Sequence, residues 1–108
     1  MALAVAAKSA GWWVYLLACA DGSYYVGITT DVARRLGQHD AGRGARYTRS
    51  RRPLTLVATV PCADRAEAMR LEAQLKRLPH LGKERFAREH PVEDEPRPRP
   101  LRDAGRGA

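Results

Sequence analysis

Two short apolar runs joined by a tight turn lie near the start of the sequence, and they limit the possible folds more than any other feature. The first run, Trp12 to Cys19, is apolar, aromatic and β-branched, which predicts a buried strand. Asp21-Gly22 is a hairpin turn signal, and Ser23 to Ile28 predicts a second strand that returns beside the first. The chain must therefore build its core around an antiparallel hairpin.

The rest of the pattern predicts helices that cover a small sheet. Thr29-Thr30-Asp31 precedes the first helix as a cap, and Asp64 caps the longest helix. The predicted elements are a helix to about Asp40, a Gly- and Arg-rich loop from Ala41 to Ser50, a strand from Leu54 to Val60, a helix from Asp64 to about Leu78, and a short helix from Leu81 to Glu89. The order β-β-α-β-α-α predicts an α/β protein of the α+β type, with a three-stranded antiparallel sheet flanked by helices.

The length of 108 residues allows one domain, which we assign to residues 11–90. Residues 1–10 are expected to be a tail, and the Pro- and Arg-rich residues 91–108 a disordered one. The N-terminus has no signal-peptide pattern, and no window approaches the ~18 apolar residues of a membrane span. Cys19 and Cys62 are expected to be buried thiols. We therefore expect a cytoplasmic protein.

The net charge of +7 indicates a polyanionic partner. Residues 34–52 hold one acid, Asp40, and seven arginines, whose planar guanidinium groups suit phosphate oxygens. The alternative is a solvated basic surface that only aids solubility. The residues predicted to contact nucleic acid are Arg34, Arg43, Arg46, Arg49, Arg51, Arg52 and Lys76.

Tyr15 and Tyr25 are the first candidate site residues, because they lie on facing strands of the predicted hairpin. Tyr24 and Tyr25 point to opposite faces, so only one of them can share a face with Tyr15. Either tyrosine alone is better explained as core filler. Gly27, within the second strand, indicates a bulge or a close approach of backbone.

Arg35 and His39 are four residues apart on the first predicted helix and neighbour each other on one face. At 100° per residue they fall at the edge of the stripe formed by Val32 and Leu36, where a polar side chain can reach a cleft. Glu72 has the same edge position on the longest helix. Taken alone, Glu72 is better explained by an i,i+4 ion pair with Lys76.

Together these residues resemble a known family. Val14-Tyr15-Leu16 and Tyr25-Val26-Gly27 stand where GIY-YIG nucleases have their two tripeptides, and an Arg, a His and a Glu follow in register. The runs YYVGITTDVARRLGQH, GARYTRSRRPLTLV and AMRLEAQLKRL are similar to the short, single-domain bacterial branch of this superfamily, the YhbQ-like proteins. The resemblance covers about residues 12–88.

The resemblance implies hydrolysis of nucleic-acid phosphodiesters with one divalent ion, Mg²⁺ or Mn²⁺. Glu72 would be its sole protein ligand, Arg35 would brace the phosphate, and Tyr25 would bond to it. Tyr15 would deprotonate or orient the water, and His39 would orient a tyrosine or carry the proton. DNA is favoured over RNA as the partner, with no membrane and no obligate protein partner. These implied roles place the five side chains in one cleft.

The sequence departs from the family at several positions. The first tripeptide reads VYL, Ile28 replaces a lysine found in some relatives, and residues 12–108 contain no Asn to match a carboxamide of many relatives. Two other interpretations stay open. One is a nucleic-acid-binding module with little or no turnover, and the other is a purely structural domain.

Overall fold

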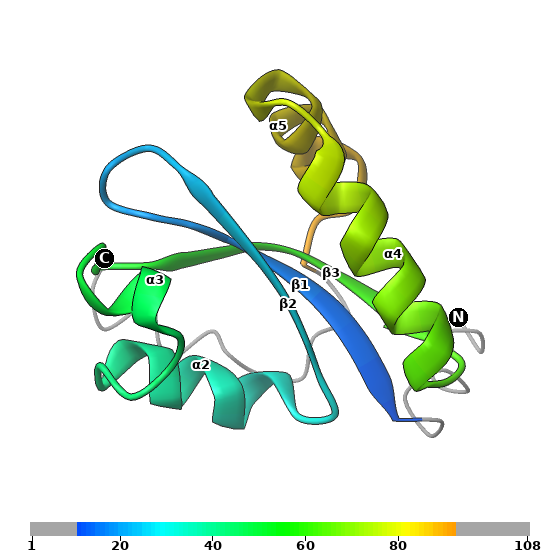
Figure 1. Ribbon diagram of the computed structural model, residues 1–108, viewed down its shortest axis with the longest axis horizontal. Coiled ribbons are helices and arrows are strands. Elements are labelled where there is room, and N and C mark those ends of the chain that lie inside the picture. Colours follow the sequence, from blue (N-terminus) through cyan, green and yellow to red (C-terminus); the bar gives the residue numbers. More distant parts are fainter. Residues whose placement is uncertain (1–10, 93–108) are drawn as a thin grey trace.

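The computed structural model describes residues 11–92, and the two predicted tails lie outside the described residues. The elements are β1 (Trp12–Ala18), β2 (Tyr24–Thr29), α2 (Val32–Asp40), α3 (Arg46–Arg49), β3 (Thr55–Cys62), α4 (Arg65–Arg77) and α5 (His80–Glu89). They form a three-stranded sheet with helices on both sides (Figure 1). The predicted α+β fold is confirmed. None of the helices within residues 11–92 has the length and apolar character needed to cross a membrane.

The sheet has the strand order β2-β1-β3, and both pairs are antiparallel. The predicted turn joins β1 to β2, with Gly22 at φ +88° and the Cys19 amide donating to the Ser23 carbonyl over 2.8 Å. A register shift interrupts the β1–β3 pairing between Leu16 and Leu17. The third strand is longer than predicted and continues through Pro61, which is tolerated because β3 is an edge strand.

The two faces of the sheet carry separate cores, as expected from the alternation of side chains along a strand. One face buries Val14 and Leu16 against α4, with Ala68 and Leu75 as the buried helix residues. The other face buries Trp13, Tyr15 and Leu17 with Val32 and Leu36 of α2. Figure 1 shows α2 and α3 on one side of the sheet and α4 and α5 on the other.

Both predicted caps are present. The Asp31 side chain accepts from the Arg34 amide over 3.0 Å, and Asp64 accepts from the Glu67 amide over 2.8 Å. Each carboxylate satisfies an N–H group at a helix start that has no partner within the helix. These caps fix where α2 and α4 begin relative to the strands that precede them.

The prediction of an unbroken loop from Ala41 to Ser50 is wrong at one point. The one-turn helix α3 lies inside it, with Thr48 fully buried. A single turn is too short to show an apolar period, and the glycines around it favour a loop interpretation. Cys19 and Cys62 are free, buried thiols, as predicted.

Candidate functional site

Tyr15 and Tyr25 lie on the same face of the hairpin, the face covered by α2. Their ring centroids are 6.3 Å apart. Tyr15 pairs across the strands with Gly27, and a side chain at position 27 would collide with the Tyr15 phenol. Gly27 therefore marks a close approach, one of the two possibilities that the sequence left open.

His39, from the last turn of α2, completes a compact group with the two tyrosines. It is fully buried, and its Nε2 atom lies 2.9 Å from the Tyr15 hydroxyl oxygen. Its ring also packs edge-on against both tyrosines, with centroid distances of 5.8 Å to Tyr15 and 5.3 Å to Tyr25. Helix α2 thus places the polar ring of His39 within the mainly apolar core on this face of the sheet.

Arg35 lies one turn before His39 and is half-buried. Its guanidinium donates to the Gln38 side chain over 2.7 Å, which holds it on the same helix. The charge of Arg35 reaches both Tyr15 and His39, since it lowers the pKa of each. These four residues, Tyr15, Tyr25, Arg35 and His39, are therefore brought together as predicted.

Burial sets the protonation of this group. It raises the pKa of Tyr15 to about 12, although the Arg35 guanidinium acts in the opposite direction. It also lowers the pKa of His39 to about 4, and the positive charge of Arg35 adds to that shift. At neutral pH the site consequently holds a neutral phenol and a neutral imidazole.

Glu72 reaches the site from a different direction. Helix α4 packs on the opposite face of the sheet from α2, so the five predicted side chains do not share one face. The Glu72 carboxylate is nevertheless among the charges that raise the pKa of Tyr15. In Figure 1, β2 is the strand nearest the viewer, and α2 and α4 lie on either side of it. Glu72 also forms the expected ion pair with Lys76, at 3.4 Å.

Among the acidic residues, Glu72 is the one that the family resemblance implies as a metal ligand. Within residues 11–92 there is no group of three or more His, Cys, Asp or Glu side chains arranged to hold a metal ion. A single, partly exposed carboxylate suits a hard cation that keeps most of its water ligands. The residues present therefore fit a Mg²⁺ or Mn²⁺ ion bound mainly by water, and they do not suit an all-protein cage.

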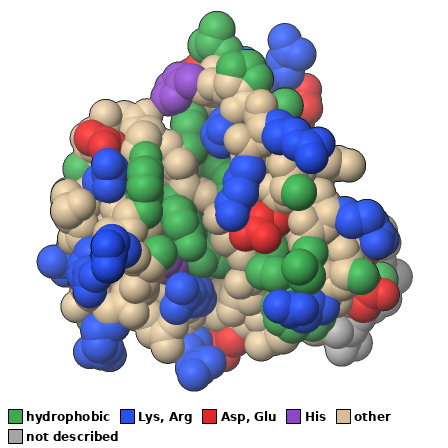
Figure 2. Space-filling view, viewed as in Figure 1, with side chains coloured by type: hydrophobic (Ala, Val, Ile, Leu, Met, Phe, Trp, Pro, Cys, Tyr) green, Lys and Arg blue, Asp and Glu red, His purple; other side chains and the backbone are tan. Residues whose placement is uncertain are grey.

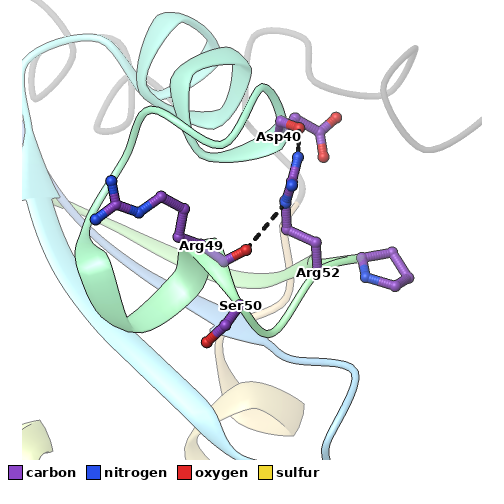
Figure 3. Close-up of a pocket in the computed structure, with 5 residues that line it drawn as sticks. Asp40, Arg49, Ser50 and Arg52 are labelled. Carbon is purple, nitrogen blue, oxygen red and sulfur yellow. Dashed lines mark hydrogen bonds between the residues drawn. The ribbon is translucent and has the colours of Figure 1, made fainter.

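The arginines of residues 34–52, other than Arg35, fall into two groups according to their contacts. Arg51 donates to Asp21 over 2.9 Å and to the Tyr47 carbonyl over 2.9 Å. Arg52 donates to the Asp40 and Arg49 carbonyls, and it lines an open pocket at the end of α2 (Figure 3). Among the described residues, no hydrogen bond or ion pair occupies the side chains of Arg34, Arg43, Arg46 and Arg49, and all four are exposed.

The space-filling view shows where these charges lie. In Figure 2, Lys and Arg side chains gather over α2 and α3, and others follow α4. The surface between these two parts is hollowed, with hydrophobic side chains inside and acidic side chains beside α4. A basic rim on both sides of a hollow suits an extended polyanion.

Three residues of the site escaped the sequence analysis. Thr48 lies 2.8 Å from Nδ1 of His39, and a side chain at Gly44 would collide with the His39 ring. Tyr47 stacks on Tyr25 with a centroid distance of 6.1 Å, and the Arg51 guanidinium lies 3.8 Å from the Tyr47 ring centroid. Of these three residues, only Tyr47 had a signal in the sequence, because it is an aromatic residue among arginines, a pattern typical of nucleic-acid contacts.

A known domain family accounts for this combination of a small sheet, paired tyrosines, a buried histidine, an arginine and a glutamate. Residues 11–84 match the family model of the GIY-YIG catalytic domain. The chain belongs to this family, which lies in a nuclease superfamily.

The relatives are similarly short proteins. A UPF0213 protein of Cupriavidus pinatubonensis is 51% identical over 75 residues, covering 69% of this chain and 83% of the relative. A UPF0213 protein of Halobacterium salinarum is 51% identical over 71 residues, covering 66% and 92%. The solution NMR structure of a protein from E. faecalis is 38% identical, with a TM-score of 0.53, and the match covers 73% of this chain and 84% of that one. The two relatives carry only the family designation UPF0213, which states no activity.

Proposed function

We propose that this protein is a cytoplasmic, metal-dependent endonuclease that hydrolyses phosphodiester bonds of nucleic acid, DNA in preference to RNA. The observation that carries the proposal is the hydrogen-bonded pair of Tyr15 and His39 beside the Arg35 guanidinium. Phosphodiester hydrolysis needs a positioned water, a proton acceptor and positive charge at the phosphate, and this group offers the last two together with a hydroxyl that can orient the water. The exposed arginines of the same segment support a polyanionic substrate.

Each residue has a role that follows from its chemistry. The Arg35 fork donates to the non-bridging oxygens of the phosphate, where negative charge grows in the transition state. The half-buried Tyr25 phenol donates a hydrogen bond to the same phosphate. Tyr15 is only 2% exposed, so in this proposal substrate binding opens its oxygen to the attacking water, which the oxygen then orients and whose proton it receives. His39 stands behind Tyr15 and accepts a proton in turn.

Glu72 holds the metal in this proposal. When bound, a Mg²⁺ or Mn²⁺ ion supplies positive charge that stabilises the leaving 3′ oxygen. Lys76, paired with Glu72 at 3.4 Å, is mostly exposed and can turn away to contact a phosphate instead.

A second candidate function is a nucleic-acid-binding module without significant turnover. The pKa values favour it, because burial raises the pKa of Tyr15 to about 12 and lowers that of His39 to about 4. Neither group is poised near neutral pH, as an efficient acid or base should be. An endonuclease needs the substrate and the metal to change these values, whereas a binding module does not.

Labelled DNA and RNA of single-stranded, duplex and branched form, incubated with Mg²⁺, Mn²⁺ or EDTA, separate the two functions. If the protein is an endonuclease, we expect cleavage of at least one substrate with a divalent ion and none in EDTA. If the protein is a binding module, we expect salt-sensitive binding and no cleavage under any condition. Binding to no nucleic acid at all would exclude both.

A further inference from the structure

The Thr48 hydroxyl is held between two partners in the buried interior of the site. Its oxygen lies 3.0 Å from the Ala45 carbonyl oxygen and 2.8 Å from Nδ1 of His39. Thr48 and His39 have no exposed surface, so water cannot replace either partner. A carbonyl oxygen can only accept, and a hydroxyl has one proton to give. The Ala45 carbonyl oxygen also accepts from the Thr48 and Arg49 amides, both at 3.1 Å, but its 3.0 Å contact with the Thr48 oxygen is a hydrogen bond only when the hydroxyl donates, and we assign the Thr48 proton to that bond.

This direction fixes the remaining protons of the group. With its own proton on Ala45, the Thr48 oxygen can only accept from His39, so Nδ1 carries the hydrogen. A neutral imidazole has one N–H group, which leaves a lone pair on Nε2. The Tyr15 hydroxyl, 2.9 Å from Nε2, must then donate to it. The Tyr15 oxygen keeps its lone pairs free to accept a hydrogen bond.

We propose that Thr48 is a positioning residue that sets the tautomer of His39, and through it the direction in which the Tyr15 hydroxyl donates. The inference rests on the proposed hydrolysis and identifies a residue that makes it possible. In the opposite tautomer, Nε2–H would donate to Tyr15, whose own proton would then point at the incoming water. A tyrosine in that orientation could not accept a proton from water.

The proton transfers balance along this chain. As the water O–H bond breaks, its proton joins the Tyr15 oxygen, and the original Tyr15 proton moves to Nε2 of His39. The hydroxide oxygen forms the new bond to phosphorus as the bond from phosphorus to the 3′ oxygen breaks, and the departing 3′ oxygen takes its proton from solvent water. His39 becomes an imidazolium whose Nδ1–H still donates to Thr48. The Arg35 charge opposes this imidazolium in the free protein, and a phosphate anion bound at Arg35 offsets that opposition.

Nitrogen-15 NMR of the imidazole tests the assignment without substrate. His80 and His90 are the other histidines of the chain, so a His80→Gln/His90→Gln background leaves His39 as the single signal. We expect long-range proton–nitrogen correlations to show hydrogen on Nδ1 at neutral pH. Thr48→Val, which keeps the shape but removes the acceptor, should move hydrogen to Nε2, and Thr48→Ser should restore the first pattern. An Nε2–H tautomer in the unsubstituted Thr48 protein would overturn the proposal.

Cleavage kinetics supply the second readout. We expect Thr48→Val to lower kcat by about 10- to 100-fold with KM unchanged, a part of the total that acid–base catalysis contributes. Thr48→Ser should stay within a few-fold of the original, whereas a purely structural role would lower the folded fraction of Thr48→Val and leave its tautomer as it was. If Thr48→Val does not fold, Thr48→Ala takes its place. If even the unsubstituted protein cleaves nothing, the proposed function fails, and the NMR measurement still decides the tautomer.

Discussion

Tyr15 and Gly27 are cross-strand partners, and the Tyr15 phenol occupies the space that any side chain at position 27 would need. A methyl group at position 27 would lie 2.5 Å from Cζ of Tyr15. We therefore expect Gly27→Ala to displace the phenol from His39 and to cost about 1–3 kcal/mol of unfolding free energy, the usual penalty for overpacking. Cleavage should fall far more than the folded fraction. Full activity in Gly27→Ala would show that the phenol can act from another position.

Gly37 provides the matched control, because it lies within α2 with nothing near its missing side chain. Gly37→Ala should raise the free energy of unfolding by about 0.5–1 kcal/mol, since alanine loses less backbone entropy in a helix. Urea unfolding measures the change, and cleavage should be unaffected. A loss of stability would mean that α2 needs a bend at this position.

The buried, neutral His39 makes stability depend on pH. Its pKa is about 4 in the folded protein, against an ordinary value of 6.5, so the unfolded chain binds more protons between these values. Stability should hold above pH 6.5 and fall as the pH drops toward 4, by at most about 1.4 kcal/mol per pH unit. Urea titrations at pH 7, 6 and 5 measure this slope. His39→Gln should be less stable at pH 7 and have a flatter profile. An equal slope in both proteins would assign it to another group.

Glu72→Gln should separate binding from cleavage. Glutamine keeps the length of the side chain but removes the charge that a metal requires, so cleavage should fall by several orders of magnitude. Binding in EDTA should persist or tighten, because a carboxylate near a phosphate repels it. Glu84→Gln is the control, since Glu84 also forms an i,i+4 ion pair, with Arg88 at 4.0 Å. If Glu72→Gln cuts as fast as Glu84→Gln, Glu72 has only its surface role.

The two groups of arginines should respond differently to substitution. Replacing Arg43, Arg46 and Arg49 by alanine should flatten the dependence of log K on log salt by about 0.9 per lost phosphate contact on duplex DNA. Arg51→Ala should instead lower the melting temperature, because Arg51 links the hairpin turn to α3. Arg85 and Arg88, exposed on α5, serve as the control pair. An unchanged slope in the triple variant would show that these arginines face solvent without a role.

The hairpin, the caps and the main helices followed from sequence because they depend on local chemistry. Asp21-Gly22, Asp31 and Asp64 act within three residues of their own positions. The cluster of Tyr15, Tyr25, Arg35 and His39 also followed, because strand and helix periods place those side chains on facing surfaces. Their exact grouping came from the family pattern, since each residue alone had an ordinary structural explanation.

The position of Glu72 and the burial of Thr48 against His39 could not be predicted in this way. Nothing in the period of α4 states which face of the sheet it covers, and only the packed structure puts it opposite α2. Thr48 lies in a single helical turn, where burial depends on contacts with a residue nine positions away. Both facts belong to tertiary packing, which local propensity does not encode.

The separation of the two cores divides the proposed site into halves that are packed independently. The hydrogen-bonded tyrosine and histidine belong to one face of the sheet, and the acidic residue is carried by a helix on the other. A change at Glu72 leaves the packing of the first half intact, so on the proposed mechanism a cleaving protein and a binding module can differ at one residue. If the proposed function holds, cleavage can be lost or regained without rebuilding the packed face that carries Tyr15 and His39.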